Sequence, residues 1–402
     1  MNIATTNPSK SMAAMYAFYP IIVITGFIQL LIPSTIHMLM SEFSVKPGEA
    51  GILPLIFYSG IMTSTIAITH IIKKFRIKSI MIFAVIVVST SLIAASQSHS
   101  FLQFAVLVFF TGFGNGTMIT LPGIYATNQH AEQSARLQST IFSFLAFGFV
   151  IGPVFPGLIS YLQLSWRWCF AFPGLLLLPA LIPIILAKHK PIDKAKKLTL
   201  HVIKEVLAFD KKFIFKLVLA LAITAGATVA LLTWLITFLE IERNTPLGVA
   251  HIVLSFMGIA AVSGRLLWGV VSAKLTAIRT LLIIVPSAAL LIFFAPLSHI
   301  VTINIIIFFM AMFFVSGINP LLLSASAIYP KSHSSSVYTL LFLAMSVGGI
   351  TIPFGIGQIF QYVNSEVGMS SIAILFIIAT GLLFFIKKEI PILKHMLKNP
   401  LI

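Results

Sequence analysis

Few side chains in this chain could support acid–base or metal chemistry away from water. The chain is 58% hydrophobic and only 9% charged, and each of its ten acidic residues falls in an expected loop or at the end of an apolar stretch. Ionisable groups are costly to bury in a membrane, so they mark functional sites there by default. We therefore expect an uncharged cavity at the centre of the apolar region. A preference for small multivalent cations and a proton relay of buried carboxylates both fit this pattern poorly.

Three titratable residues lie near the ends of apolar stretches, on one expected side of the chain: His37, Glu240 and His251. Histidine is the side chain that most readily changes charge near neutral pH. We hypothesise that His37 or Glu240 couples proton movement to the function of the chain. The alternative is that both are interfacial residues in contact with lipid headgroups or water.

The motifs of several enzyme classes are missing. The sequence has no His-Glu-x-x-His, no Gly-x-Ser-x-Gly and no Gly-Lys pair of a phosphate-binding loop. Its one cysteine, Cys169, excludes an internal disulfide and any cysteine-based zinc or iron–sulfur site. We therefore expect no enzyme, no cofactor and no metal site. An intramembrane enzyme and a non-transporting sensor or channel stay open as lesser alternatives.

Twelve apolar stretches organise the chain, each near the ~20 residues that one bilayer crossing needs. They cover residues 16–40, 51–72, 79–97, 101–125, 138–161, 168–187, 213–239, 249–271, 278–297, 300–328, 336–362 and 369–386. The sequence thus predicts an all-α polytopic membrane protein.

The chain is expected to divide into three parts. An N-terminal six-helix bundle covers 1–187 and a basic cytoplasmic linker covers 188–212. A C-terminal six-helix bundle with a short cytoplasmic tail covers 213–402. Apolar residues at helical spacing in 198–209 predict a short amphipathic surface helix, or else a solvated linker.

The basic residues predict the orientation in the membrane. If the N-terminus is inside, 23 of the 26 Lys and Arg residues fall on the inner side and three on the outer. Basic loops stay cytoplasmic, so both termini are expected there. The net charge of +16 is then mostly a topology signal and does not indicate nucleic-acid binding. No cleavage signal follows the first stretch, which we expect to be retained in a bacterial inner membrane. The expected partners are the lipid bilayer, a small-molecule substrate and protons, with the chain a monomer.

The two halves repeat with a period of about 200 residues. Asn115 lies ten residues before Tyr125, and Asn319 lies ten before Tyr329. The fifth and eleventh stretches share a pattern of glycine and proline at Gly148, Gly152, Pro153 and Gly157, and at Gly348, Pro353 and Gly357. Two like-oriented bundles of this kind suit alternating access to a site at the membrane midplane. Glycine permits close helix approach and proline frees a carbonyl, so these stretches are expected to pack tightly and bend.

The chain resembles the major facilitator superfamily along almost its whole length. GFVIGPVFPG at 148–157 is similar to the motif of the drug:proton antiporter branch, SWRWCF at 165–170 to its W-R-W-x-F, and SGRLLWG at 263–269 to its G-R-x-x-x-G. The resemblance implies a secondary transporter with two six-helix bundles. It also implies that helices 1, 4, 7 and 10 line the cavity.

The expected gate departs from the family pattern. The family loop between helices 2 and 3 carries an acid, whereas 69–78 reads THIIKKFRIK. The basic character survives, and a cytoplasmic gate is expected at Lys73, Lys74, Arg76, Arg265 and Lys274. Arg265 is interpreted as a structural gate rather than an anion site. Val108 stands where many antiporters have an arginine in helix 4.

Neutral polar residues are the candidates for substrate binding, because an amide in hydrocarbon needs partners. For each, the alternative is a hydrogen bond that only aids helix packing. The candidates are Gln29, Tyr58, Asn115, Thr228, Trp234 and Asn319.

The function expected from the resemblance is proton-coupled export of a small neutral or amphipathic organic solute by alternating access. The alternative is uptake or facilitated diffusion of a nutrient metabolite such as a sugar, amino acid or organic acid. Neither the substrate nor the direction follows from the sequence.

Overall fold

The computed structural model describes residues 12, 14–72, 74–129, 134–187, 189, 211–328 and 331–398. In this part of the chain every regular element is helical, and twelve helical segments are long and apolar enough to cross a membrane. Each of the twelve expected stretches coincides with one of them, which confirms the predicted fold class. The reason is that a backbone in hydrocarbon must satisfy its hydrogen bonds within its own segment.

Within the described residues, the first six crossings contain the helices from α2 to α10, and some of these crossings are interrupted. The first crossing is split at Leu30, and the fifth at Gly152 and Pro153. The helices are α2 (Tyr19–Gln29), α3 (Leu31–Phe43), α4 (Pro47–Ala50), α5 (Ile52–Ile71), α6 (Ile77–Ala95), α7 (Phe101–Gln129), α8 (Ser134–Ile151), α9 (Val154–Tyr161) and α10 (Arg167–Leu186).

The last six crossings form the second half of the chain and are interrupted at a different place. Here the tenth crossing is split, at Ser316 and Gly317, while the eleventh runs through Pro353 without a break. The elements are α12 (Lys211–Arg243), α13 (Leu247–Leu275), α14 (Ala277–Phe294), η2 (Ala295–Leu297), α15 (Val301–Val315), α16 (Ile318–Leu323), η3 (Ser324–Ile328), α17 (Lys331–Tyr362) and α18 (Ser365–Lys398).

The repeat extends to the turns that join the crossings. Ser44 after α3 and Asn244 after α12 both adopt a left-handed backbone, with φ of 52° and 47°. Each is followed within three residues by a proline, Pro47 or Pro246, that opens the next helix. Such a turn reverses the chain tightly, so helices of one half lie beside each other.

Two helix backbones nearly touch at equivalent positions of the two halves. A β-carbon added to Gly148 would lie 2.8 Å from the Cα of Gly26, and one added to Gly348 would lie 3.0 Å from the amide nitrogen of Gly226. Gly26 and Gly226 are 200 positions apart, as are Gly148 and Gly348. The fifth crossing therefore packs on the first as the eleventh packs on the seventh. The expected role of Gly148 and Gly348 in close packing agrees with this geometry.

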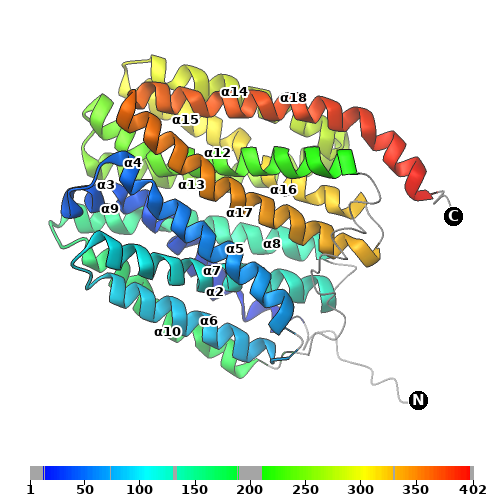
Figure 1. Cartoon of the computed structure of the whole chain (residues 1–402), viewed down its shortest axis with the longest axis horizontal. Helices are drawn as coiled ribbons and strands as arrows, with labels where there is room; N and C mark the ends of the chain where they lie inside the picture. Colours follow the sequence, from blue (N-terminus) through cyan, green and yellow to red (C-terminus); the bar gives the residue numbers. More distant parts are fainter. Residues whose placement is uncertain are drawn as a thin grey trace.

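The two sets of six crossings lie side by side, with their helices roughly along the long axis of the molecule (Figure 1). Between the sets, α12 packs on α3, α17 on α4 and α5, and α13 on α8 and α9. We name the two ends of the molecule by their residues. The basic end carries Lys74, Arg76, Lys211 and Lys274, and the far end carries the turns at Ser44 and Asn244 and their neighbours.

Three predictions concern residues that lie wholly or mostly outside the described part of the chain. Lys73 and the 198–209 segment, with its expected surface helix, lie outside the described residues. The division of the chain at 188–212 also remains a prediction. Within that range the description covers only residues 189, 211 and 212, and α12 already begins at Lys211.

The glycine contacts predict a difference between two substitutions in α17. Gly348→Ala would place its β-carbon 2.7 Å from the carbonyl carbon of Ala222, whereas Gly355 has no atom within 4 Å of that position. Overpacking costs about 1–3 kcal/mol, while Ala is favoured over Gly by about 1 kcal/mol in a helix interior. We expect Gly348→Ala to lower the thermal unfolding temperature in detergent and Gly355→Ala to leave it unchanged or raise it. Equal effects would contradict the packing role of Gly348.

Candidate functional site

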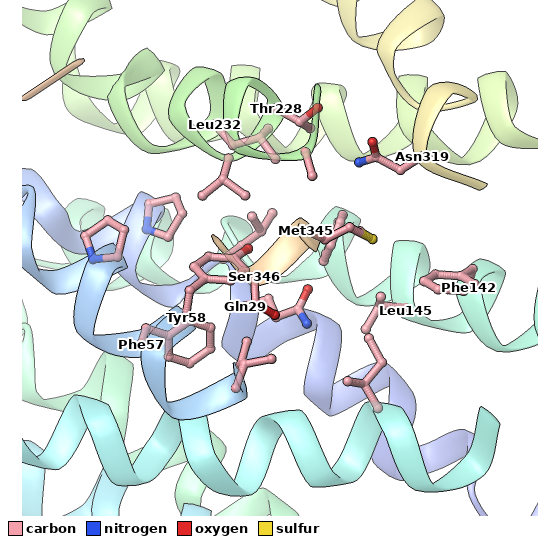
Figure 2. Close-up of a pocket in the computed structure, with 18 of the residues that line it drawn as sticks. Gln29, Phe57, Tyr58, Phe142, Leu145, Thr228, Leu232, Asn319, Met345 and Ser346 are labelled. Carbon is pink, nitrogen blue, oxygen red and sulfur yellow. The ribbon is translucent and has the colours of Figure 1, made fainter. Parts of the chain in front are cut away.

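A cavity lies between the two bundles, near the middle of the long axis. Its volume is about 1060 Å³ when the part open to solvent is included. Figure 2 shows that its walls come from helices of both halves. It is lined by Gln29, Leu30, Ile32, Pro33, Pro54, Phe57, Tyr58, Ile61, Ile119, Phe142, Leu145, Phe149, Ala225, Thr228, Val229, Leu232, Thr233, Arg265, Asn319, Pro320, Leu323, Phe342, Met345 and Ser346.

Four of the six predicted binding residues line this cavity: Gln29, Tyr58, Thr228 and Asn319. The Asn319 Oδ1 accepts a hydrogen bond of 3.2 Å from the Thr224 hydroxyl, which leaves the Asn319 amide nitrogen as a donor. The Thr228 hydroxyl donates to its own helix at the Thr224 carbonyl. These side chains come from the first, second, seventh and tenth crossings, and a solute between the bundles can meet both halves at once.

Asn115 is not part of the lining; it lies behind it. Its side chain is fully buried, and its Nδ2 donates to the Thr25 carbonyl at 3.3 Å. Its Oδ1 accepts a hydrogen bond from the Gln29 Nε2 at 3.4 Å. Asn115 therefore positions Gln29, which does line the cavity. The equivalent place of Asn115 and Asn319 in the repeat does not give them equal access to the cavity.

Trp234 is also absent from the lining. The indole is fully buried, and its Nε1 donates to the Pro353 carbonyl at 2.9 Å. A β-carbon added to Gly357 would lie 2.6 Å from the indole ring, so Gly357 makes room for it. Trp234 joins the seventh and eleventh crossings of one bundle, which is the packing alternative of the sequence prediction.

The expectation of an uncharged cavity is wrong, because Arg265 belongs to the lining. Its Nη1 donates to the Phe142 carbonyl at 3.1 Å, across the interface from α13 to α8. The prediction rested on the absence of carboxylates and on the place of Arg265 toward the inner end of its helix. The long stem carries the guanidinium to the facing bundle instead of to the membrane surface.

The rest of the lining is apolar and rich in aromatic rings. Phe57, Phe142, Phe149 and Phe342 contribute rings, and Met345 adds a thioether. Tyr58 packs over Gly349, where an added β-carbon would lie 2.7 Å from its ring, so the second and eleventh crossings meet closely there. Such walls suit an organic solute with an apolar body and few polar groups.

Several polar contacts join the two bundles at the far end. His37 Nδ1 of α3 lies 2.7 Å from Glu240 Oε2 of α12, with both side chains 28% exposed. The Gly48 amide of α4 donates to Gln361 Oε1 of α17 at 3.0 Å, and Gln358 Nε2 donates to the Gly48 carbonyl at 3.0 Å. This set of contacts, together with the His251 contact described next, forms what we call the far gate.

His251 lies at the centre of the far gate, with both ring nitrogens against carbonyl oxygens. Nε2 is 2.7 Å from the Ser34 carbonyl of the other bundle, and Nδ1 is 2.8 Å from the Leu247 carbonyl of its own helix. The residue is fully buried, and Gly157 of α9 packs on its β-carbon. Carbonyl oxygens only accept hydrogen bonds, so both contacts are satisfied only by an imidazolium.

Three of the five predicted cytoplasmic gate residues lie at the basic end, whereas Lys73 is outside the described residues and Arg265 lines the cavity. Lys74, Arg76 and Lys274 are exposed to the surroundings. The described ion pairs involve other residues: Arg167 with Glu42, Lys216 with Glu389, and Arg243 with Glu366, besides His37 with Glu240. Within the described residues, the basic end thus has basic side chains without the acid partners of the family gate.

The sequence did not indicate the role of Gly26 and Gly226, the contact of His251 or the position of Arg265. Gly26 and Gly226 could have been found, because they show the 200-residue repeat already seen for Gly148 and Gly348. The cross-bundle contact of His251 and the place of Arg265 in the cavity gave no such signal. Both depend on which side chain of the other half lies opposite.

Comparison with protein families agrees with this architecture. The profile described as Major Facilitator Superfamily matches residues 18–353. The chain belongs to this superfamily. It is thus an integral multi-pass membrane protein of a transporter family. No curated protein matches it in sequence.

Solved structures of other superfamily members share the fold at low sequence identity. A bacterial homologue of the human lysosomal transporter Spinster, in an inward-facing and unoccupied conformation, has a TM-score of 0.79 at 16% identity over 96% of this chain and 99% of the other. A D-xylose–proton symporter gives 0.78 at 13%, over 93% and 97%. The Escherichia coli fucose:proton symporter gives 0.67 at 17%, over 94% and 99%.

The cavity geometry predicts the reactivity of two cysteines in α12. Thr228 lines the cavity, whereas Thr237 is fully buried and does not. With buried Cys169 replaced by serine, we expect Thr228→Cys to react with a charged methanethiosulfonate reagent at least about tenfold faster than Thr237→Cys, because only the former meets water. Mass spectrometry measures both rates, and equal labelling in denaturant is the control. Similar rates in the folded protein would contradict the assigned lining.

Proposed function

We propose that the chain is a secondary transporter that moves a small organic solute by alternating access. The observation that carries this proposal is a cavity lined by both bundles together with a far gate that joins the same bundles. If the bundles rock about the cavity, the far gate breaks while contacts form at the basic end. A solute held between the halves would then reach the opposite side of the membrane.

We further propose that the basic end faces the cytoplasm of a bacterial cell and that the cavity opens toward it. The excess of basic residues at this end supports the first statement. The contacts of the far gate and the likeness to an inward-facing Spinster homologue support the second. The monomeric state and the division into 1–187, 188–212 and 213–402 remain parts of the same proposal.

The direction of transport is proposed as export, from the likeness of 148–157 to the motif of drug:proton antiporters. Its Gly148 and Gly152–Pro153 lie where α8 packs on α2 and where the fifth crossing is interrupted. Uptake of a nutrient is the second candidate. It is supported by the likeness to structures described as xylose and fucose proton symporters.

The transport proposal predicts counterflow. Purified protein in proteoliposomes preloaded with an unlabelled solute should accumulate the labelled form transiently, because the same site is loaded on both sides. The solute is chosen from sugars, amino acids, carboxylates and amphipathic dyes by its stabilisation of the protein against heat. A channel would equilibrate without such an overshoot, and an enzyme would convert the solute. Either result would overturn the proposal.

Proton coupling is proposed for the far gate, with His37, Glu240 and His251 as the titrating groups. The groups that face His251 are the carbonyls of Ser34 and Leu247, and it interacts electrostatically with His37 and Glu240. A neutral imidazole would turn a lone pair toward one of the two carbonyls. Protonation of His251 therefore favours the closed far gate, and closure weakens as the pH rises and the imidazole loses its charge.

This coupling predicts a pH-dependent distance at the far end. Spin labels at Lys46→Cys and Val363→Cys, both exposed, report the separation of the bundles beside the Gly48 contact. We expect a short distance at pH 5.5 and a growing population of longer distances at pH 8.5. His251→Gln should remove this dependence, while His299→Gln, at an exposed position of the same end, should keep it.

Flux driven by a pH gradient that survives both His37→Gln and Glu240→Gln would exclude those two residues as proton carriers.

A further inference from the structure

The guanidinium of Arg265 is only partly satisfied by the protein. One of its nitrogens donates to the Phe142 carbonyl at 3.1 Å, and its carbon lies 5.6 Å from the centre of the Phe149 ring. The Nε atom is buried and has no hydrogen-bond partner. A guanidinium has five N–H donors in a planar fork, so several of these donors remain for another acceptor.

The charge of Arg265 is also uncompensated. The lining contains no Asp or Glu, and in the described part of the chain no ion pair involves Arg265. Arginine stays protonated in proteins, so the charge cannot be lost to ease its burial. An isolated cation away from bulk water is costly, and a counter-ion that enters the cavity relieves that cost.

The position of this charge argues against a purely structural role. Arg265 reaches across to the other bundle, where it meets Phe142, itself part of the cavity wall. A side chain that served only to anchor α13 at the membrane surface would extend toward the basic end, where headgroups and water are found. Here the cation is instead placed on the path that a solute takes between the two halves.

We propose that the cavity binds an organic monocarboxylate, with the carboxylate paired to Arg265 and an apolar body against the phenylalanine rings. This inference rests on the proposal that the cavity is the transport site and names its substrate class. One permanent positive charge favours one negative charge on the solute. Paired donors of a guanidinium match the two oxygens of a carboxylate.

The other polar groups of the lining fit the same solute. Gln29 and Asn319 carry amides on opposite bundles. The Gln29 Nε2 donates to the Asn115 Oδ1, and the Asn319 Oδ1 accepts from the Thr224 hydroxyl. The Asn319 amide nitrogen is a donor that can meet a carboxylate oxygen or a substituent on the body of the solute. Phe57, Phe142, Phe149 and Phe342 enclose that body, so an aryl or alkyl acid is expected to bind better than a small hydrophilic one.

The experiment compares acids with amides of the same shape. Thermal unfolding of the purified full chain in detergent is measured with benzoate and benzamide, phenylacetate and phenylacetamide, and hexanoate and hexanamide. We expect at least one acid to stabilise the protein at concentrations at least about tenfold below its amide, since a charged hydrogen bond is worth more than a neutral one. If no acid stabilises the protein, or if acids and amides act equally, the proposal is overturned.

Variants test whether Arg265 causes the preference for acids over amides. Arg265→Gln should abolish the difference between acid and amide, and Arg265→Lys should keep part of it because the charge remains while the fork is lost. Arg279→Gln removes the same charge from an exposed position of α14 and should leave the preference intact. A preference unchanged in a folded Arg265→Gln protein, or lost equally in Arg279→Gln, would falsify the assignment to Arg265.

The outcomes separate this inference from the proposed function. If neutral solutes show counterflow and Arg265→Gln behaves like the unaltered chain, the carboxylate site fails while the transporter proposal stands. If carboxylates stabilise the protein through Arg265 but show no counterflow, the site stands and the transport proposal fails.

Discussion

Close contact between helix backbones is the interaction on which the rest of this structure depends. Inside a membrane, helices gain little from burying apolar surface against each other, so they associate through packing and hydrogen bonds. In each bundle, one pair of glycines lets two crossings approach until their backbones touch, Gly26 with Gly148 and Gly226 with Gly348. A comparable approach joins the two bundles, where a β-carbon added to Gly258 of α13 would lie 2.7 Å from the Phe149 carbonyl oxygen of α8.

The interface between the bundles is polar at the far end and amphipathic in the middle. The far gate consists of an ion pair, amide contacts at Gly48 and the doubly engaged ring of His251. His251, a titratable group, thus lies among the contacts that join the two bundles.

Much of the fold and part of the site could be predicted from the sequence. The twelve crossings follow from apolar length alone, and the repeat of Gly148 and Gly348 indicated the tight pairs. Of the predicted binding residues, Gln29, Tyr58, Thr228 and Asn319 line the cavity. Asn115 and Trp234 do not, because the helix that carries each of them turns that side chain toward its own bundle, where backbone carbonyls satisfy it.

The number of bilayer crossings follows from the apolar stretches alone. Every backbone group in hydrocarbon must find its partner in its own helix, so an apolar run of sufficient length has no other stable form. The sequence also determined that carboxylates avoid the helix centres. Only the tertiary structure shows which groups of the two bundles face each other. The partners of Arg265 and His251 belong to the opposite bundle, more than a hundred residues away. The Arg265 guanidinium could point into the cavity or toward the membrane surface. Which of the two occurs depends on the rotation of its helix and on the wall that faces it, and no local sequence pattern encodes either.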